Sequence, residues 1–340
     1  MKPRQIALLS IILAFALLAA PLPSDGQQPA KVYRIAYLGV STGGYDTDPH
    51  NCPIQGAPHW QALVEGLRED GYIKGENLVI ECRWTKGREE DAPTLATELV
   101  SLKPDLIVAM GTVLVLAAKQ ATRTIPIVMV DVGDPVGRGL VASLVHPGGN
   151  VTGLTFTFME MEGKRLQLLK EAVPKASRVA VLSYLTGAPR SGFRREEETA
   201  ARALGVTLQF YEVRALEELE AAFVAMKKER AEALLVVPDP FFYLHAQRIV
   251  DLAAKSRLPA MYPFRESAKA GGLMAYDLNR PEVFRRIGFY VDKILKGTNP
   301  GDLPVEQPTK FELVINLKTA NALGLKIPES LLRRADEVVQ

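Results

Sequence analysis

Short apolar runs rich in β-branched residues alternate with longer amphipathic segments along most of the chain. Runs without the polar alternation of a half-buried strand are typical of parallel sheets that helices cover on both faces. The predicted strands of the first half span 35–40, 78–80, 106–109, 127–130 and 151–154. Those of the second half span 179–182, 207–213, 233–237 and 259–262. This alternation predicts an α/β fold class with parallel sheets.

The strand and helix pattern ends near residues 153–160 and then starts again, so we expect two lobes of similar construction. The segment from Gly271 onward carries one more amphipathic helix and one more strand-helix piece, which must pack on lobes already built. The chain therefore crosses between the lobes more than once, and such crossings make a hinge. We expect lobe 1 to comprise 31–153 with about 277–300, lobe 2 to comprise 154–272 with about 305–335, and the hinge to lie near 153–158 and 271–277.

The N-terminal 26 residues have the three parts of a secretory signal peptide. Lys2 and Arg4 precede an apolar run over 6–20, and a small, polar, helix-breaking stretch follows at 21–26. The run is shorter than the roughly 20 residues that a membrane-spanning helix needs. We therefore expect a signal peptide over 1–26 and a periplasmic mature protein. That compartment permits disulfides, so Cys52 and Cys82 are either bridged or free thiols.

Composition and the absence of known motifs argue against several functional classes. The 340 residues carry 41 Lys and Arg against 39 Asp and Glu, which gives no basic surface for nucleic acid. Four histidines and two cysteines offer little material for a metal site. The sequence lacks a Gly-x-Ser-x-Gly elbow, a Walker loop, a Gly-x-Gly-x-x-Gly loop after the first strand and a His-Glu-x-x-His motif. We expect no catalysis, no cofactor, no metal and no nucleic-acid partner.

Small and polar residues follow the predicted strands, at the edge where open α/β sheets bind their ligands. Hydroxyls and free N–H groups there suit an anionic group, Asp134 and Asp239 suit an ammonium group, and Arg265 suits a second acid. Aromatic side chains at the same edge would form apolar walls. The candidate ligand-binding residues are Ser41, Thr42, Gly111, Thr112, Asp134, Pro135, Tyr184, Asp239, Phe242, Arg265 and Tyr276. The alternative is that these are ordinary turn residues and core aromatics.

Several strings, in order, resemble the ABC-transporter substrate-binding proteins of the tryptophan/tyrosine-binding type. The strings are Gly133-Asp134-Pro135-Val136-Gly137, Pro147-Gly148-Gly149-Asn150-Val151-Thr152-Gly153, Gly163-Lys164-Arg165-Leu166, Gly271-Gly272-Leu273-Met274-Ala275-Tyr276 and the segment 308–320. The resemblance covers about 33–339 and implies a type I periplasmic-binding-protein fold, with two Rossmann-like lobes, three crossovers and a ligand between the lobes. It places the ligand-facing loops at 41–42, 111–112, 134–135, 239–240 and around Tyr276. The chain departs from the family in a longer first loop (43–53) and in the loop after Leu182.

The resemblance and the strand-end residues lead to one functional hypothesis. We expect an extracytoplasmic solute-binding component of an ABC importer, which captures an amino-acid-like solute or aromatic acid between two closing lobes. Its partners would be that small molecule and an ABC permease in the inner membrane, and the protein would act as a monomer. The alternatives are an exported α/β enzyme acting on a small molecule and a ligand sensor that feeds a receptor.

Overall fold

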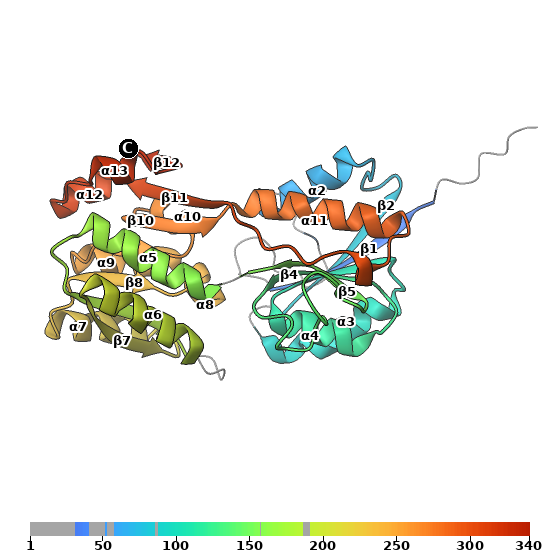
Figure 1. The fold of residues 1–340 in the computed structure, drawn as a ribbon, viewed down its shortest axis with the longest axis horizontal. Coiled ribbons are helices and arrows are strands. Elements are labelled where there is room, and N and C mark those ends of the chain that lie inside the picture. The colour runs from blue at the N-terminus through green and yellow to red at the C-terminus, as the bar shows by residue number, and fades with distance from the viewer. Residues whose placement is uncertain (1–30, 41–51, 53–57, 86–87, 157, 186–190) are drawn as a thin grey trace, which may run out of the picture. The chain divides into compact units, whose positions relative to one another are not determined.

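Two β-sheets organise the chain (Figure 1). The computed structural model describes residues 31–40, 52, 58–85, 88–156, 158–185 and 191–340. The expected signal peptide and the candidates Ser41 and Thr42 lie outside the described residues.

Sheet 1 has the strand order β2-β1-β3-β4-β5, and its neighbouring strands are all parallel. The bounds of its strands are β1 Tyr33–Gly39, β2 Leu78–Trp84, β3 Leu106–Met110, β4 Ile127–Val132 and β5 Val151–Thr155. The helices packed on this sheet are α2 Pro58–Glu69, α3 Ala92–Ser101, α4 Thr112–Ala121 and α11 Arg280–Leu295, with short 3₁₀ turns η1 at Glu89–Asp91 and η2 at Pro300–Asp302.

Sheet 2 has the strand order β12-β11-β10-β9-β8-β6-β7. The bounds of its strands are β6 Arg178–Tyr184, β7 Thr207–Val213, β8 Ala233–Val236, β9 Ala260–Tyr262, β10 Met274–Leu278, β11 Phe311–Asn316 and β12 Glu337–Val339. Its helices are α5 Phe158–Ala172, α6 Ser191–Leu204, α7 Glu218–Lys228, α8 Pro240–Leu244, α9 Ala246–Lys255, α10 Arg265–Lys269, α12 Leu317–Leu323 and α13 Glu329–Leu332. Among the described strand pairs, β10 and β11 run antiparallel and the others run parallel.

Helices on both faces explain why the strands are apolar almost throughout. In β3, Leu106 and Val108 belong to the buried cluster beneath α2 and α11. Ile107 and Ala109 belong to the cluster beneath α3 and α4. Each side chain of such a strand leaves water whichever way it points, so the usual polar alternation is lost. The α/β architecture predicted from these runs is confirmed.

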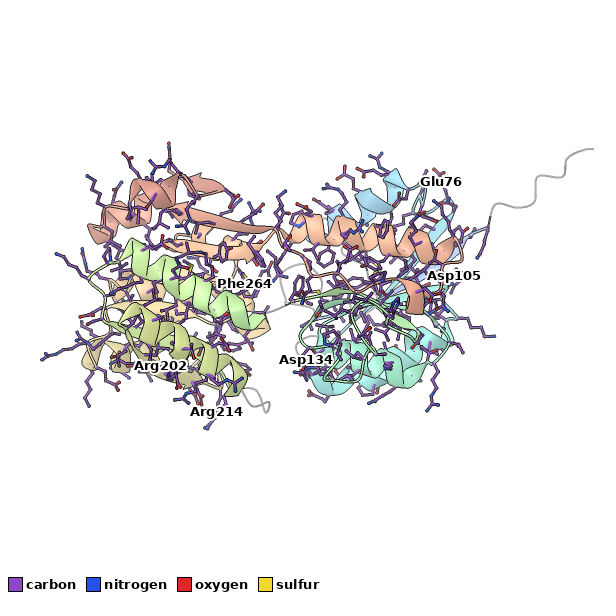
Figure 2. All side chains as sticks on the ribbon, viewed as in Figure 1. Glu76, Asp105, Asp134, Arg202, Arg214 and Phe264 are labelled. Atoms are coloured by element: carbon purple, nitrogen blue, oxygen red, sulfur yellow. A yellow bond between two sulfur atoms is a disulfide. The ribbon has the colours of Figure 1, made fainter. Side chains whose placement is uncertain are left out.

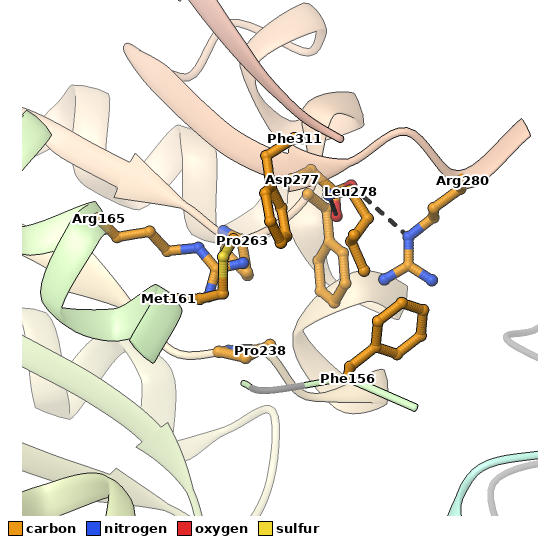
Figure 3. Close-up of a pocket in the computed structure, with 10 residues that line it drawn as sticks. Phe156, Met161, Arg165, Pro238, Pro263, Asp277, Leu278, Arg280 and Phe311 are labelled. Atoms are coloured by element: carbon orange, nitrogen blue, oxygen red, sulfur yellow. Dashed lines mark hydrogen bonds and ion pairs between the residues drawn. The ribbon is translucent and has the colours of Figure 1, made fainter. Parts of the chain in front are cut away.

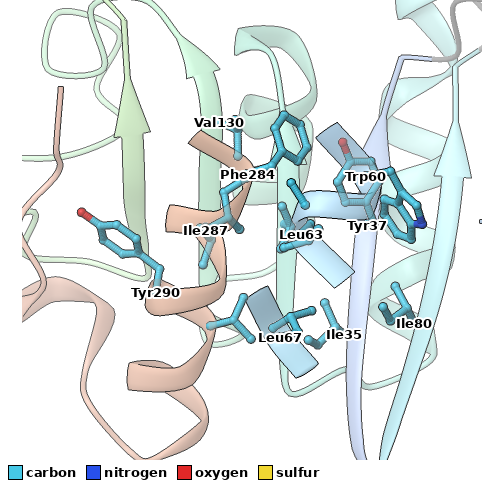
Figure 4. Close-up of a cluster of buried hydrophobic side chains, with 14 of the residues drawn as sticks. Ile35, Tyr37, Trp60, Leu63, Leu67, Ile80, Val130, Phe284, Ile287 and Tyr290 are labelled. Atoms are coloured by element: carbon cyan, nitrogen blue, oxygen red, sulfur yellow. The ribbon is translucent and has the colours of Figure 1, made fainter. Parts of the chain in front are cut away.

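Helix α11 reaches sheet 1 although it lies late in the chain. Its Phe284 and Ile287 are buried with Leu63 of α2 and with strand residues (Figure 4). A Cβ on Gly288 would lie 3.4 Å from the backbone carbon of Gly66, so the absent side chain lets α11 and α2 approach closely. This packing holds a late segment of the chain against the first sheet.

The chain passes between the two sheets three times. It leaves sheet 1 after β5, returns through Asn279 into α11, and leaves again between η2 and β11. Residues 274–277, for which the sequence predicted part of a hinge, belong to β10 inside sheet 2, and the chain leaves this sheet after Leu278. The first and third connections lie side by side, because Glu306 bonds through its backbone to Gly153 and Thr155. No helix among the described residues has the length and apolarity to cross a lipid bilayer.

Candidate functional site

The loops at the carboxyl ends of sheet 1 carry unusual backbone conformations. Gly111 has φ +93° and precedes Thr112, the first residue of α4. Asp131 (φ +59°) and Asp134 (φ +49°) take the left-handed conformation that non-glycine residues seldom adopt. The Asp134 carboxylate is exposed and accepts a hydrogen bond from the Gly137 N–H, while Pro135 is buried beside it. Asp134, labelled in Figure 2, thus stabilises its own turn through this hydrogen bond, and its role toward a ligand stays a prediction.

Aromatic side chains gather at the carboxyl ends of sheet 2. Tyr184, the last residue of β6, stacks on Phe241 with ring centroids 4.3 Å apart, and Phe242 meets Tyr184 edge-on. Phe242 is 2% exposed, so it supports this group from beneath. Asp239 caps α8 by accepting a hydrogen bond from the Phe241 N–H at 2.8 Å. The structure thus brings Tyr184, Asp239 and Phe242 together as the sequence suggested.

Arg265 and Tyr276 make contacts within the chain. The Arg265 guanidinium donates to the carboxylates of Glu312 and Glu337, so the chain itself supplies its acidic partners. The Tyr276 ring lies against the Phe311 ring at 5.6 Å. Both residues lie near the candidate site, and ligand contact by either of them stays a prediction.

An ionic cluster absent from the sequence-based candidates lies where β10 passes into α11. Arg280, the first residue of α11, reaches Asp131 Oδ2 at 3.2 Å. It also reaches Asp277 Oδ2 at 3.6 Å (Figure 3). Its guanidinium carbon lies 5.3 Å from the centroid of the Phe264 ring. The side chains of Arg280, Asp131 and Asp277 are 18%, 13% and 3% exposed. Arg280 therefore joins a strand end of sheet 1 to a strand end of sheet 2.

The cluster holds more carboxylates than cations. Arg280 faces Asp131, Asp277 and also Glu266 of α10. Burial raises the pKa of Asp277, which Arg280 partly offsets, and burial followed by the nearby Asp277 raises the pKa of Glu266. Burial alone would lower the pKa of Arg280, but these carboxylates outweigh it and raise that pKa. Arg165 also acts to lower the pKa of Asp277, and Arg265 that of Glu266, so two further cations lie within electrostatic reach of these carboxylates.

Two carboxylate oxygens in the cluster are buried without a hydrogen-bond donor among the described residues. They are Asp131 Oδ1 and Glu266 Oε2, and Arg280 Nε is also buried, with Asp277 Oδ2 at 3.6 Å as an ion-pair partner beyond hydrogen-bond distance. A buried polar atom left unpaired costs about 1–3 kcal/mol, so each atom has a reason to take a ligand or water partner. A bound group that donates at one end and accepts at the other would satisfy all three.

A small cavity of about 20 Å³ lies beside this cluster. Its lining includes Phe156, Arg165, Phe264, Asp277, Arg280 and Phe311 (Figure 3). That volume has room for about one water molecule. An organic ligand would need more space than this cavity provides.

A sequence signal for Arg280 exists in retrospect. Asn279 caps α11 by accepting a hydrogen bond from the Glu282 N–H, and Pro281 follows, so the helix start is readable from the residues. A cation in the first turn opposes the helix dipole, which favours negative charge there. An arginine in such a position, directly after a strand, needs a compensating partner, and Asp131 and Asp277 supply it.

Two α/β units, one with a parallel sheet and one with a sheet that is parallel except between β10 and β11, are linked by three crossovers and define a type I periplasmic-binding-protein fold. The family model described as ABC transporter substrate binding protein matches residues 58–339, and the chain belongs to this family. Members of the family bind a small-molecule ligand and deliver it to a permease, and they are solute-binding proteins rather than enzymes. The expectation of this family from the sequence is confirmed.

Individual relatives are similar over most of the chain. A tyrosine-binding protein of Clostridioides difficile is 28% identical over 276 residues, which cover 78% of this chain and 76% of that protein. An ABC domain from Streptococcus pneumoniae, solved in complex with L-Trp, has a TM-score of 0.78 and 26% identity, covering 91% of this chain and all of that one. A conserved domain protein from Vibrio cholerae has a TM-score of 0.77 and 27% identity, with the same coverage.

Proposed function

We propose that this protein is the extracytoplasmic solute-binding component of an ABC importer and that its ligand is an aromatic amino acid. The observation that carries the proposal is the Arg280 cluster, which offers a cation for a carboxylate and two unpaired carboxylate oxygens for an ammonium. Those are the two charged groups of an α-amino acid. The ligands printed for two relatives, tyrosine and L-Trp, support the aromatic class.

Aromatic side chains near the cluster suit the ligand's ring. Phe264 lies beside Arg280, and Tyr184 and Phe241 form a stacked pair at the end of β6. Rings of this kind recognise another ring through offset-stacked or edge-on contact, worth about 0.5–1.5 kcal/mol a pair beyond the area buried. The residues predicted from the sequence, among them Thr112 and Asp239, remain part of the proposed site.

Binding requires motion in this proposal. Ligand pockets have volumes of roughly 300–1,000 Å³, far above the cavity of about 20 Å³. We propose that one lobe is built on sheet 1 and one on sheet 2, that the three connections near 156, 279 and 303–310 form the hinge, and that a ligand touching both lobes favours the closed state.

The proposed location is the periplasm, reached through the signal peptide at 1–26, with a permease in the inner membrane as partner and a monomer as the working form. The disulfide between Cys52 and Cys82 supports an oxidising compartment. N-terminal sequencing of the protein from a periplasmic extract tests the location, since recovery of residues 1–26 on the purified chain would contradict it.

Calorimetric titration of unfolded, dialysed and refolded protein with L-Tyr, L-Trp and L-Phe tests the ligand class. We expect binding of at least one of them. Arg280→Gln should weaken that binding about 30-fold or more, because it removes the charged partner of the ligand carboxylate. Asp131→Asn should weaken it as well, and Asn tolerates the left-handed backbone at this position.

Arg333→Gln is the control, since Arg333 forms an exposed pair with Glu329 on α13. It should bind like the wild type. No heat from any aromatic amino acid, or equal affinity in the Arg280 and Arg333 variants, would contradict the proposal.

A further inference from the structure

All three connections reach sheet 2 through elements that lie next to one another. The first connection enters α5, the second leaves β10, and the third enters β11. Strands β10 and β11 pair in antiparallel register, with Leu278 opposite Phe311. The two strand ends next to the second and third connections therefore lie side by side. A further contact is needed to link α5 to them.

A buried ion pair supplies that tie. Arg165 of α5 is paired with Glu162 one turn earlier, and their side chains are 4% and 0% exposed. Arg165 Nε also donates to the backbone carbonyl oxygen of Tyr276 at 2.9 Å. The β9–β10 register runs only to Ala275, so this carbonyl lies beyond the ladder, and a side chain of α5 takes the place of a strand neighbour.

A ring contact extends the tie to the third connection. The Tyr276 ring packs on Phe311, the first residue of β11, with centroids 5.6 Å apart. Glu162, Arg165, Tyr276 and Phe311 thus run unbroken from α5 through β10 to β11.

A buried ion pair is weak evidence for stability, because its desolvation cost can exceed its Coulombic gain. Replacing such a pair by apolar residues of similar volume is often neutral or stabilising. The ion pair matters here for its geometry, because it orients Arg165 of α5 toward the Tyr276 carbonyl oxygen of β10. We propose that these four residues form a hinge brace, which fixes the sheet 2 ends of the three connections relative to one another.

The proposed role of the brace is to position the hinge, apart from any ligand contact that Tyr276 makes; this role rests on the proposed closure of two lobes. With the ends of the connections fixed at sheet 2, lobe motion is confined to one rotation. Without the brace, each connection moves independently, so the ligand-free protein samples more orientations and fewer of them are competent to bind. The brace residues are thus positioning residues for ligand capture.

The distance between two spin labels in the ligand-free protein measures this directly. Val145→Cys and Val224→Cys give label sites that are 62% and 68% exposed, one in the part of the chain built on sheet 1 and one on α7. The native cysteines are joined in a disulfide and do not take the label. In this background, the Glu162→Gln/Arg165→Met double variant removes both charges without leaving one buried alone, and Phe311→Leu removes the ring contact independently.

We expect both variants to broaden the distance distribution and to lower affinity for the bound amino acid about 2- to 30-fold. Arg165→Lys, which keeps the positive charge but lacks the planar guanidinium, should have a smaller effect than the double variant. Arg334→Gln is the matched control, because it breaks another pair of α5, with Glu171, away from the connections. It should leave the width and the affinity unchanged.

If the folded double variant keeps the wild-type distance distribution and the wild-type affinity for the amino acid, the proposed brace is wrong. If that variant does not fold, Phe311→Leu decides: a broader distribution supports the brace and an unchanged one overturns it. If the wild type binds no aromatic amino acid, the proposed function fails, whereas the ligand-free distance measurement still decides the brace.

Discussion

At the residue scale, backbone crowding decides which side chains sheet 1 tolerates. Gly153 of β5 has φ +127°, and a Cβ there would lie 2.3 Å from the Met129 carbonyl oxygen and 2.7 Å from the Met129 nitrogen. Both are backbone atoms of the neighbouring strand, so they cannot turn aside as a flexible side chain would. The β4–β5 register also shifts just past Met129. Glycine at this position therefore permits both the close approach and the irregular pairing.

Gly153→Ala should lower the free energy of unfolding by about 2–6 kcal/mol, since overpacking and a positive φ each cost about 1–3 kcal/mol. Urea unfolding followed by circular dichroism measures the loss. Gly149→Ala is the control, because its added Cβ meets no atom within 4 Å, and its midpoint should stay near that of the wild type. Equal midpoints for the two variants would show that β5 moves away from β4 at little cost.

At the element scale, a covalent tie fastens the start of the α2 region to sheet 1. Cys52 precedes α2, Cys82 lies in β2, and a disulfide joins them with their Cα atoms 5.2 Å apart. Both residues are buried, with exposed fractions of 6% and 0%. A crosslink over a sequence separation of 30 restricts the unfolded chain as well as the folded loop.

Reduction of this disulfide should cost about 3.6 kcal/mol of unfolding free energy, by the loop-closure entropy of a crosslink this long. Urea titrations with and without reductant measure it. The Cys52→Ser/Cys82→Ser variant should match the reduced wild type and should not respond to reductant. A wild-type midpoint that is the same in both redox conditions would rule out a stabilising crosslink.

At the scale of the whole molecule, the Arg280 cluster draws on elements from both sheets. Asp131 comes from β4 of sheet 1, Asp277 from β10 of sheet 2 and Glu266 from α10. Burial raises the pKa values of Glu266 and Asp277 above those of the unfolded chain. The folded protein therefore keeps protons that the unfolded chain has already released, and global stability becomes linked to pH.

This linkage has a definite sign for Glu266. Above its ordinary pKa near 4.5, the unfolded chain loses the proton first, so the contribution of Glu266 to stability declines as pH rises through its folded pKa and returns as pH falls. Glu266→Gln cannot titrate. Lowering the pH from 7 to 5 should therefore raise the melting temperature of the ligand-free wild type relative to that of the Glu266→Gln variant. Identical pH dependence of the two melting temperatures would contradict the raised pKa.

Some residues of the candidate site can be predicted from the local sequence pattern, and others cannot. Strand ends are readable from periodicity, so the sequence predicts that Tyr184, Phe242 and Asp239 lie at the same edge of a sheet, and the structure brings them together. Arg280 was missed because its partner Asp131 lies 149 residues away along the chain. Arg265 suggested a ligand partner in the sequence, but the antiparallel β11 and the final strand β12 bring Glu312 and Glu337 to it.

Local periodicity and composition are properties of neighbouring residues, so the sequence by itself determined the α/β class and the repeated unit. The family followed from strings of residues that resemble those of its members. Long-range packing decided the rest. Only the tertiary structure placed the return into α11 after Leu278, turned β11 antiparallel and joined Arg280 to carboxylates from both sheets. The reason is physical: a buried charge is tolerated only where distant segments meet to pair it, and sequence spacing does not encode that meeting.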